Sequence, residues 1–262
     1  GRDSSSSLVR SSESLLMTKA IGIIPARMES ARLPGKALVD ICGMPMIIHT
    51  AKRALMSKTL TDVYIATDSK EIKANAESYG IKSIMTDTKH KNSSERAAEA
   101  CKSIESEIVV NIQGDEPLLY PEHIDLITQP LLDDKDVQVS IGITKFYKKN
   151  STSDIKAVLD AENNLIYSSR SDIPHFYMKQ ADHFWKLCFI VPHRKVWLEK
   201  YLEWGPSPLE IIEDNHFLRL MENGIAIRAI EIDDAKISVD TPEDLEEVRA
   251  LMNKDKLLKL YQ

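Results

Sequence analysis

Short apolar runs alternate with segments of helical periodicity through the first half of the chain, up to about residue 132. Apolar runs bounded by turn residues are typical of buried strands, and their alternation with helices is typical of a parallel sheet. We therefore predict an α/β fold with a mostly parallel, doubly wound sheet. The expected strands are 20–26, 63–67, 82–86 and 108–113, and the expected helices are 46–57, 69–79 and 94–103.

The pattern changes near residue 137, where strand-like runs follow one another with few helices between them. This change predicts a mixed-sheet insertion at about 137–224 within a single domain that spans 17–252. The elements expected from here on are strands at 137–146, 156–160, 165–169 and 187–191, helices at 193–204 and 208–223, strands at 225–232 and 236–239, and a closing helix at 241–251.

The first strand-like run ends in a loop that carries three cations, Arg27, Arg32 and Lys36. Three positive charges at a strand end, close to the N-terminus of the next helix, suit the binding of a polyphosphate. The loop is not a Walker A motif, because Ser30 and Ala37 stand where that motif needs Gly and Ser or Thr. It also lacks the Gly-x-Gly-x-x-Gly turn of dinucleotide-binding proteins. A solvated basic loop is the alternative interpretation.

Two further strand ends carry carboxylates. Asp115 follows the apolar run 107–113 in a sharp turn, and Asp240 follows the short run 237–239. Strand ends are where an open α/β sheet places ligand-binding groups, and Mg²⁺ takes oxygen ligands while it keeps phosphates and waters as partners. Both acids are therefore candidate Mg²⁺ ligands. For Asp115 the alternative is an ordinary turn residue, and for Asp240 it is part of the cap of the helix that begins near Thr241.

Composition narrows the class of protein. The 262 residues carry a net charge of −6 and are 43% hydrophobic, which suits a globular enzyme and gives no overall field that attracts nucleic acid. No apolar run reaches the length of a membrane span, so we expect no membrane partner. The three cysteines lack the spacing of a metal site and predict reduced thiols in a cytoplasmic protein.

The two ends of the chain differ in composition from the rest. Residues 1–16 are rich in serine, and we expect them to be a tag or a disordered extension that precedes Met17 as the natural start. Residues 253–262 are expected to form a basic, solvated tail. The predicted domain excludes both segments.

Three motifs occur in a specific order: 24–36 with its cations, 113–117, which reads Gln-Gly-Asp-Glu-Pro, and 239–245, which reads Val-Asp-Thr-Pro-Glu-Asp-Leu. This order resembles the CMP-KDO synthetase family, the 3-deoxy-manno-octulosonate (KDO) cytidylyltransferases, from about residue 19 to residue 252. The resemblance implies a Rossmann-like nucleotidyltransferase fold and a cytoplasmic homodimer, with the mixed-sheet region on the acceptor side and at the dimer contact. Further segments that fit are 94–96, 169–174 and 206–210.

The resemblance also implies a reaction, the Mg²⁺-dependent transfer of CMP from CTP to an acidic sugar such as KDO, with release of pyrophosphate. Such a reaction belongs to lipopolysaccharide biosynthesis. The family pattern assigns the CTP phosphates to Arg27 and Lys36, with Arg32 nearby, and Mg²⁺ to Asp115 and Asp240. Arg27, Lys36 and Asp115 are the implied catalytic residues. The remaining implied contacts are Ser94, Arg96 and Gln113 around the nucleotide and Arg170 facing the acid.

The chain departs from the family mainly on the acceptor side. Residues 186–191 read Lys-Leu-Cys-Phe-Ile-Val where the family usually has a His-Leu-Gly-Ile-Tyr-like segment, and His216 and Phe217 replace a Glu-Gln pair. Lys186 and His216 are therefore candidate acceptor contacts. On the nucleotide side, residues 92–94 read Asn-Ser-Ser where the family usually has Ser-Gly-Thr.

These changes leave two alternatives to KDO transfer. One is a cytidylyltransferase for a different acceptor, such as a modified KDO, another sugar acid, a phosphonate or a phosphate, because a single hydroxyl in a polar pocket can change discrimination by orders of magnitude. The other is a non-catalytic nucleotide-binding regulator. A regulator would be expected to lose a metal carboxylate or the loop lysine, but Lys36, Asp115 and Asp240 are all present.

Overall fold

The computed structural model describes residues 19–233 and 235–262, so the expectation for residues 1–16 lies outside the described residues. None of the described helices is long and apolar enough to cross a membrane. The strands are β1 (Ala20–Ala26), β2 (Asp40–Ile41), β3 (Met44–Pro45), β4 (Leu60–Thr67), β5 (Lys82–Met85), β6 (Ile108–Ile112), β7 (Val139–Phe146), β8 (Lys156–Leu159), β9 (Leu165–Ser169), β10 (Phe184–Cys188), β11 (Ile190–Arg194) and β12 (Ile227–Glu231). The helices are η1 (Lys36–Leu38, a 3₁₀ turn), α1 (Met46–Leu55), α2 (Lys70–Ser78), α3 (Ser93–Cys101), α4 (Pro121–Asp133), α5 (Lys195–Trp204), α6 (Pro208–Glu213), α7 (Leu218–Glu222), α8 (Pro242–Met252) and α9 (Leu258–Tyr261).

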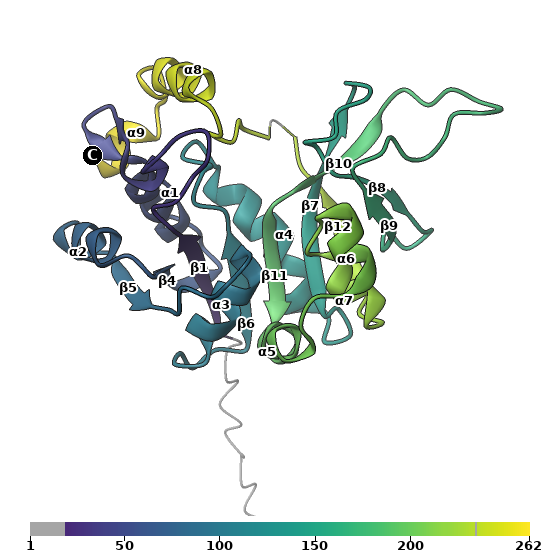
Figure 1. Cartoon of the computed structure of the whole chain (residues 1–262), viewed down its shortest axis with the longest axis horizontal. Helices are drawn as coiled ribbons and strands as arrows, with labels where there is room; N and C mark the ends of the chain where they lie inside the picture. The colour runs from purple at the N-terminus through teal and green to yellow at the C-terminus, as the bar shows by residue number, and fades with distance from the viewer. Residues whose placement is uncertain (1–18, 234) are drawn as a thin grey trace, which may run out of the picture.

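One ten-stranded sheet runs through the molecule in the order β5-β4-β1-β6-β11-β7-β10-β8-β9, with β12 paired to β7 (Figure 1). Its first four strands, β5, β4, β1 and β6, are all parallel, and α1, α2 and α3 fall between them in the chain. The predicted parallel α/β architecture is therefore confirmed for this half. A small two-stranded sheet, β2 with β3, lies apart from it.

Strand β1 illustrates why this half forms. Ile21 and Ile23 pack in the cluster that includes residues of α3, whereas Ala20 and Ile24 pack in the cluster that includes residues of α1. Helices thus cover both faces of the strand. A strand buried on both faces is apolar along its whole length instead of alternating, which is the pattern seen in the sequence.

The second half of the sheet has mixed strand directions. Strand β11 joins it to the parallel half by antiparallel pairing with β6, and the pairs β7–β10, β10–β8 and β8–β9 are also antiparallel, whereas β12 runs parallel to β7. The predicted mixed-sheet region therefore continues the central sheet and does not form a second one. This continuity places residues of the two halves next to each other at the β6–β11 seam.

Two predicted elements are interrupted at places that matter for the site. The expected strand at 187–191 is divided at Phe189 between β10 and β11. The expected helix at 208–223 is divided into α6 and α7, because Asp214 adopts a left-handed conformation with φ of 47° that ends α6. Periodicity alone predicted one element in each case, since the flanking apolar positions keep the same spacing across the break.

The strand predicted at 236–239 is wrong, because no strand forms at the described residues of this segment. The backbone N–H of Val239 instead donates a hydrogen bond to the carbonyl oxygen of Asp115 at 2.8 Å. This bond ties the segment before α8 to the turn after β6. The sequence could not supply this partner, which lies more than a hundred residues away.

The prediction of a solvated C-terminal tail is also wrong. Leu258 in α9 is buried, and the hydroxyl of Tyr261 lies 2.9 Å from Nδ1 of His49 and 3.0 Å from Nε of Arg53. Arg53, fully buried in α1, also forms an ion pair with Asp255 at 2.6 Å. The lysines of the tail gave it a basic composition, but its apolar positions and its tyrosine dock it onto α1.

Candidate active site

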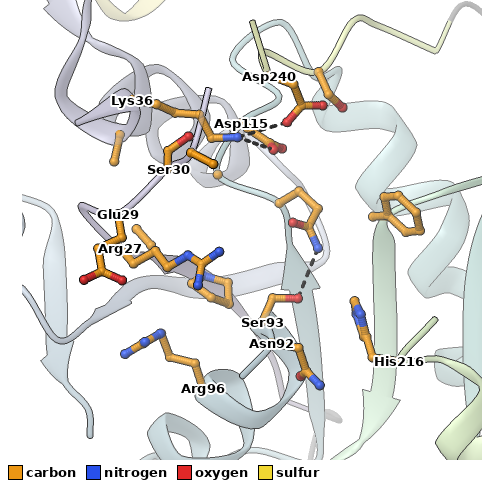
Figure 2. Close-up of a pocket in the computed structure, with 18 of the residues that line it drawn as sticks. Arg27, Glu29, Ser30, Lys36, Asn92, Ser93, Arg96, Asp115, His216 and Asp240 are labelled. Carbon is orange, nitrogen blue, oxygen red and sulfur yellow. Dashed lines mark hydrogen bonds and ion pairs between the residues drawn. The ribbon is translucent and has the colours of Figure 1, made fainter. Parts of the chain in front are cut away.

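A cavity of about 570 Å³ opens at the carboxyl ends of β1 and β6, where the parallel half of the sheet meets the mixed half (Figure 2). Its lining comes from the loop after β1, the start of α1, the loop before α3 and the turn after β6, and from Phe189 and His216 in the second half. This is where an open α/β sheet is expected to bind its ligands. Most of the residues predicted from the sequence are brought together here.

The cationic loop after β1 forms one wall. Gly35 has φ of 67°, a conformation that glycine adopts without strain, and its N–H donates to the carbonyl of Met28 at 3.1 Å, which closes the loop. Arg27 lines the cavity and makes no ion pair with the described residues, so its charge is available to an anion. Arg32 is largely exposed and lies 3.9 Å from Asp240. The predicted phosphate-binding cations therefore share one wall.

Lys36 lies between the two candidate metal carboxylates. Its Nζ is 3.1 Å from Asp115 Oδ2 and 3.1 Å from Asp240 Oδ1 (Figure 2). The helix cap that competed for Asp240 in the sequence is supplied by Thr241, whose hydroxyl accepts from the N–H of Asp244 in a capping box. The side chain of Asp240 is thus left to face Asp115 and Lys36.

The charges of Lys36, Asp115 and Asp240 shift the pKa values within this cluster. Burial raises the pKa of Asp115, the neighbouring Asp240 raises it further, and Lys36 only partly opposes them. Burial alone would lower the pKa of Lys36, but the two carboxylates outweigh it and the pKa is raised. A second positive charge at this point would relieve the repulsion between the two acids.

The carboxylates of Asp115 and Asp240 suit Mg²⁺ better than a metal ion that takes all of its ligands from the protein. The described residues contain no group of three or more His, Cys, Asp or Glu side chains that could hold a metal ion. Mg²⁺ usually takes one or two carboxylates and completes its shell with substrate phosphates and waters. Asp115 and Asp240, two hard oxygen donors facing the cationic loop, match that arrangement.

The nucleotide-side residues lie around the N-terminus of α3. Nε2 of Gln113 donates to Ser93 Oγ at 3.2 Å, and both residues line the cavity. Arg96 also lines it, nearly buried and paired with Asp68 at 3.1 Å. Ser94, which the family pattern implied, is buried with its hydroxyl toward Asn111 and does not line the cavity. Ser93 is therefore the serine of this loop that faces the cavity.

The acceptor-side wall is aromatic and neutral. His216 lines the cavity, and burial lowers its pKa to about 4, so the imidazole is neutral at pH 7. Its Nε2 has no hydrogen-bond partner among the described residues. Its ring lies 4.2 Å from that of Phe217, which stacks on Phe189 with ring centroids 5.3 Å apart. The break between β10 and β11 brings Phe189 into the cavity lining.

The two predicted acceptor cations are already engaged within the protein. Arg170 lines the cavity, but its guanidinium donates to the carbonyls of Thr152, Glu213 and Asp214 at 2.7–3.0 Å. Lys186 forms an ion pair with Asp154 at 2.7 Å and is not part of the lining. Their roles as acceptor contacts stay predictions.

The cavity is also lined by Asn92, Ser93 and Phe189, which lie in segments that depart from the family pattern but were not among the predicted contacts. The sequence does indicate a structural role for Asn92, because Asn followed three residues later by Glu95 is typical of a helix start. In the structure its side chain accepts a hydrogen bond from the N–H of Glu95 at 2.9 Å. Phe189 carried no such signal, since it sits inside an apolar run. Only the strand break reveals it.

Comparison with known proteins agrees with this geometry. The profile of the family described as Cytidylyltransferase matches residues 21–257. The chain is 36% identical over 238 residues to the 3-deoxy-manno-octulosonate cytidylyltransferase of Escherichia coli, a match that covers 90% of this chain and 97% of the relative. The enzyme of the same name from Zea mays is 38% identical over 242 residues, covering 90% of this chain and 81% of that protein.

Solved structures point to the same family as the similar sequences do. A structure of CMP:2-keto-3-deoxy-manno-octonic acid synthetase complexed with CTP superposes with a TM-score of 0.87 at 36% identity, over 90% of this chain and 99% of the other. A 4-diphosphocytidyl-2C-methyl-D-erythritol synthase from Anaerococcus prevotii, at a TM-score of 0.61 and 14% identity, shares the fold. The chain therefore belongs to the 3-deoxy-manno-octulosonate cytidylyltransferase family and is a nucleotidyltransferase of the cytidylyltransferase type.

Proposed function

We propose that this protein catalyses the Mg²⁺-dependent transfer of CMP from CTP to an acidic sugar, with KDO as the first candidate, and releases pyrophosphate. The observation that carries the proposal is the convergence of Lys36, Asp115 and Asp240 within 3.1 Å contacts in a cavity that Arg27, which forms no ion pair with the described residues, also lines. Cations that meet a triphosphate and two acids that hold its metal ion are what nucleotidyl transfer needs.

The proposed reaction is an in-line displacement. An oxygen of the acceptor forms a bond to the α-phosphorus of CTP, the bond from that phosphorus to the bridging oxygen breaks, and pyrophosphate leaves while the acceptor proton passes to solvent. Arg27 and Lys36 bind the phosphates and neutralise the charge that develops on the leaving group. Asp115 and Asp240 would hold Mg²⁺, which supplies Lewis-acid polarisation of the phosphoryl oxygens. Gln113, Ser93 and Arg96 orient the nucleotide.

The choice of KDO rests on the names of the relatives, and one observation favours a second candidate. The acceptor wall has a neutral His216 with an unpartnered Nε2, beside the stacked rings of Phe189 and Phe217. A wall of this kind suits an acceptor with an apolar or hydrogen-bonding substituent. A modified KDO or another sugar acid that carries such a substituent is therefore the alternative acceptor.

A homodimer in the cytoplasm is part of the proposal. In support, the segment between β9 and β10 projects from the body of the molecule and exposes Tyr177 and Met178 at 82% and 90% (Figure 1). On α6, Ile211 and Ile212 are also largely exposed. Neighbouring exposed apolar side chains, unlike ones scattered singly, are typical of surfaces that a partner covers. Sedimentation velocity of the wild type against an Ile211→Asp/Ile212→Asp variant tests this surface.

The decisive experiment is pyrophosphate release from CTP with Mg²⁺, measured against a panel of KDO, amino-KDO, other ulosonic acids and small phosphonates. We expect release that depends on the acid and on the metal. Release with another acid but not with KDO would retain cytidylyl transfer and change the acceptor. CTP binding with no release for any acid would contradict the enzyme proposal and favour the regulator.

A further inference from the structure

A buried tyrosine joins the two walls of the cavity. Tyr201, on α5, is fully buried, and its hydroxyl accepts a hydrogen bond from Nδ2 of Asn92 at 3.1 Å. The same hydroxyl donates to the carbonyl oxygen of His216 at 2.9 Å. Asn92 belongs to the nucleotide-side loop and His216 to the acceptor-side break between α6 and α7, and both line the cavity. One oxygen atom therefore bridges the two walls.

Each partner of Tyr201 has a defined position of its own. Oδ1 of Asn92 accepts from the N–H of Glu95 and caps α3, which leaves its Nδ2 for Tyr201 and fixes the orientation of the amide. Helix α3 carries the cavity residues Ser93 and Arg96. Because this cap bond does not depend on Tyr201, loss of the tyrosine hydroxyl should leave the start of α3 and its nucleotide contacts in place and free the His216 side.

A buried ion cluster holds the ring of Tyr201 from behind. The guanidinium of Arg219 lies 3.9 Å from the ring centroid and donates to the Tyr201 carbonyl at 3.0 Å. Arg219 is itself fully buried and pairs with Glu210 at 2.6 Å and with Glu95 at 3.1 Å. The ring is thus held by contacts that do not involve its hydroxyl, although the hydroxyl also lies 3.5 Å from Oε1 of Glu210.

We propose that Tyr201 is a positioning residue, whose hydroxyl sets the distance between the nucleotide bound near α3 and the acceptor bound near His216. The proposal rests on the proposed function, because it concerns the geometry of transfer between those two ligands. Reaction requires the attacking oxygen and the α-phosphorus to be aligned, and a misplacement of about 1 Å can cost about 100-fold in rate.

The first test is Tyr201→Phe, compared with Tyr261→Phe. Both changes remove one hydroxyl that bridges two elements, but Tyr261 joins α9 to α1 through His49 and Arg53, away from the cavity. We expect both variants to lose some thermal stability. Only Tyr201→Phe should lower kcat and raise the KM of the acceptor, for a combined loss of about 10- to 100-fold in kcat/KM, with the Kd of CTP from calorimetry unchanged. Equal loss of turnover in both variants would overturn the proposal.

The second test removes the hydrogen bond between Asn92 and Tyr201 by changing Asn92. Asn92→Ser keeps a helix-capping oxygen but cannot reach the Tyr201 hydroxyl. If the two residues act through one bond, the double variant should be no slower than the slower single variant. Multiplicative losses would mean that they act separately. This variant leaves the core intact and keeps the proposal testable if Tyr201→Phe fails to fold.

Hydrogen exchange separates this proposal from the proposed function. CTP should slow amide exchange at 91–96 in both the wild type and Tyr201→Phe, but it should slow exchange at 214–218 only in the wild type. That result would support the bridge even if no acid on the panel accepted CMP. Equal protection of 214–218 in both proteins would overturn it, whatever the acceptor is.

Discussion

The two walls of the cavity handle charge in opposite ways. On the nucleotide side, Arg27 is free of ion pairs with the described residues and Lys36 shares two close carboxylates, so charge is gathered for a ligand. On the acceptor side, Arg170 and Lys186 are engaged by the protein itself, and His216 is neutral at pH 7. The comparison teaches that a cation counted in the sequence is not a cation available to a substrate.

The largest expected effect tests the charged wall. Asp115→Asn and Asp240→Asn should each lower kcat by about 1000-fold, because each removes a hard anionic oxygen from the proposed Mg²⁺ site. Since burial raises the pKa of Asp115, its neutral replacement should not lower the melting temperature of the metal-free protein at pH 7. Steady-state kinetics and calorimetry check both statements.

A matched control is Asp133→Asn, which changes an exposed carboxylate at the end of α4 and should leave kcat unchanged. Near-normal turnover of Asp115→Asn or Asp240→Asn at saturating Mg²⁺ would remove that residue from the metal site. If both variants turned over normally, the charged wall would bind phosphate without a protein-held ion.

The next largest effect concerns recognition of the nucleotide base by the nucleotide side of the cavity. CTP should be preferred over UTP, ATP and GTP, by about 100-fold over UTP, because a site that hydrogen-bonds one base leaves buried groups unpaired with another. Competition kinetics of pyrophosphate release measure this. Equal rates with UTP and CTP would point to the loop at 92–94, where Ser93 stands in the place of the family glycine.

A smaller effect is expected on the acceptor wall. His216→Ala should lower kcat/KM for the preferred acid by about 10-fold while the KM for CTP stays the same, because a buried polar group left without its hydrogen-bond partner costs about 1–3 kcal/mol. The carbonyl of His216 remains in this variant, so the bridge to Tyr201 is kept.

Kinetics with a panel of acids also decide the substrate. If KDO gives the highest kcat/KM of the panel, the altered-acceptor hypothesis is wrong.

The last expected effect is on the pH dependence of the free energy of unfolding. Burial lowers the pKa of His193 in β11 to about 4, below its unfolded value near 6.5. Between these values the unfolded chain binds more protons, so the free energy of unfolding rises with pH and falls on acidification through this window. His193→Leu should make that fall shallower in urea titrations at pH 4.5 to 7. An unchanged slope would mean that His193 does not titrate in this way.

Much of the fold followed from local pattern. The parallel half was predicted mainly because β1 and β6 are largely apolar runs buried on both faces, a signal that needs no distant partner. The breaks at Phe189 and Asp214 were not predicted, because the apolar spacing continues across each of them and gives no sign of a left-handed residue such as Asp214. The C-terminal helix was missed for another reason, since its partners His49 and Arg53 lie far away in the sequence, in α1.

The sequence by itself determined the kinds of groups present, three cations in one loop and an acid after each of two apolar segments, because their residue types and motif order are local properties. Only the tertiary structure decided which of them act together. It brought Lys36 to both Asp115 and Asp240, put Ser93 in the cavity instead of Ser94, and engaged Arg170 with a backbone carbonyl and Lys186 with Asp154, partners distant in the chain. Charge availability and burial are set by neighbours in space, and the order of residues along the chain does not specify those neighbours.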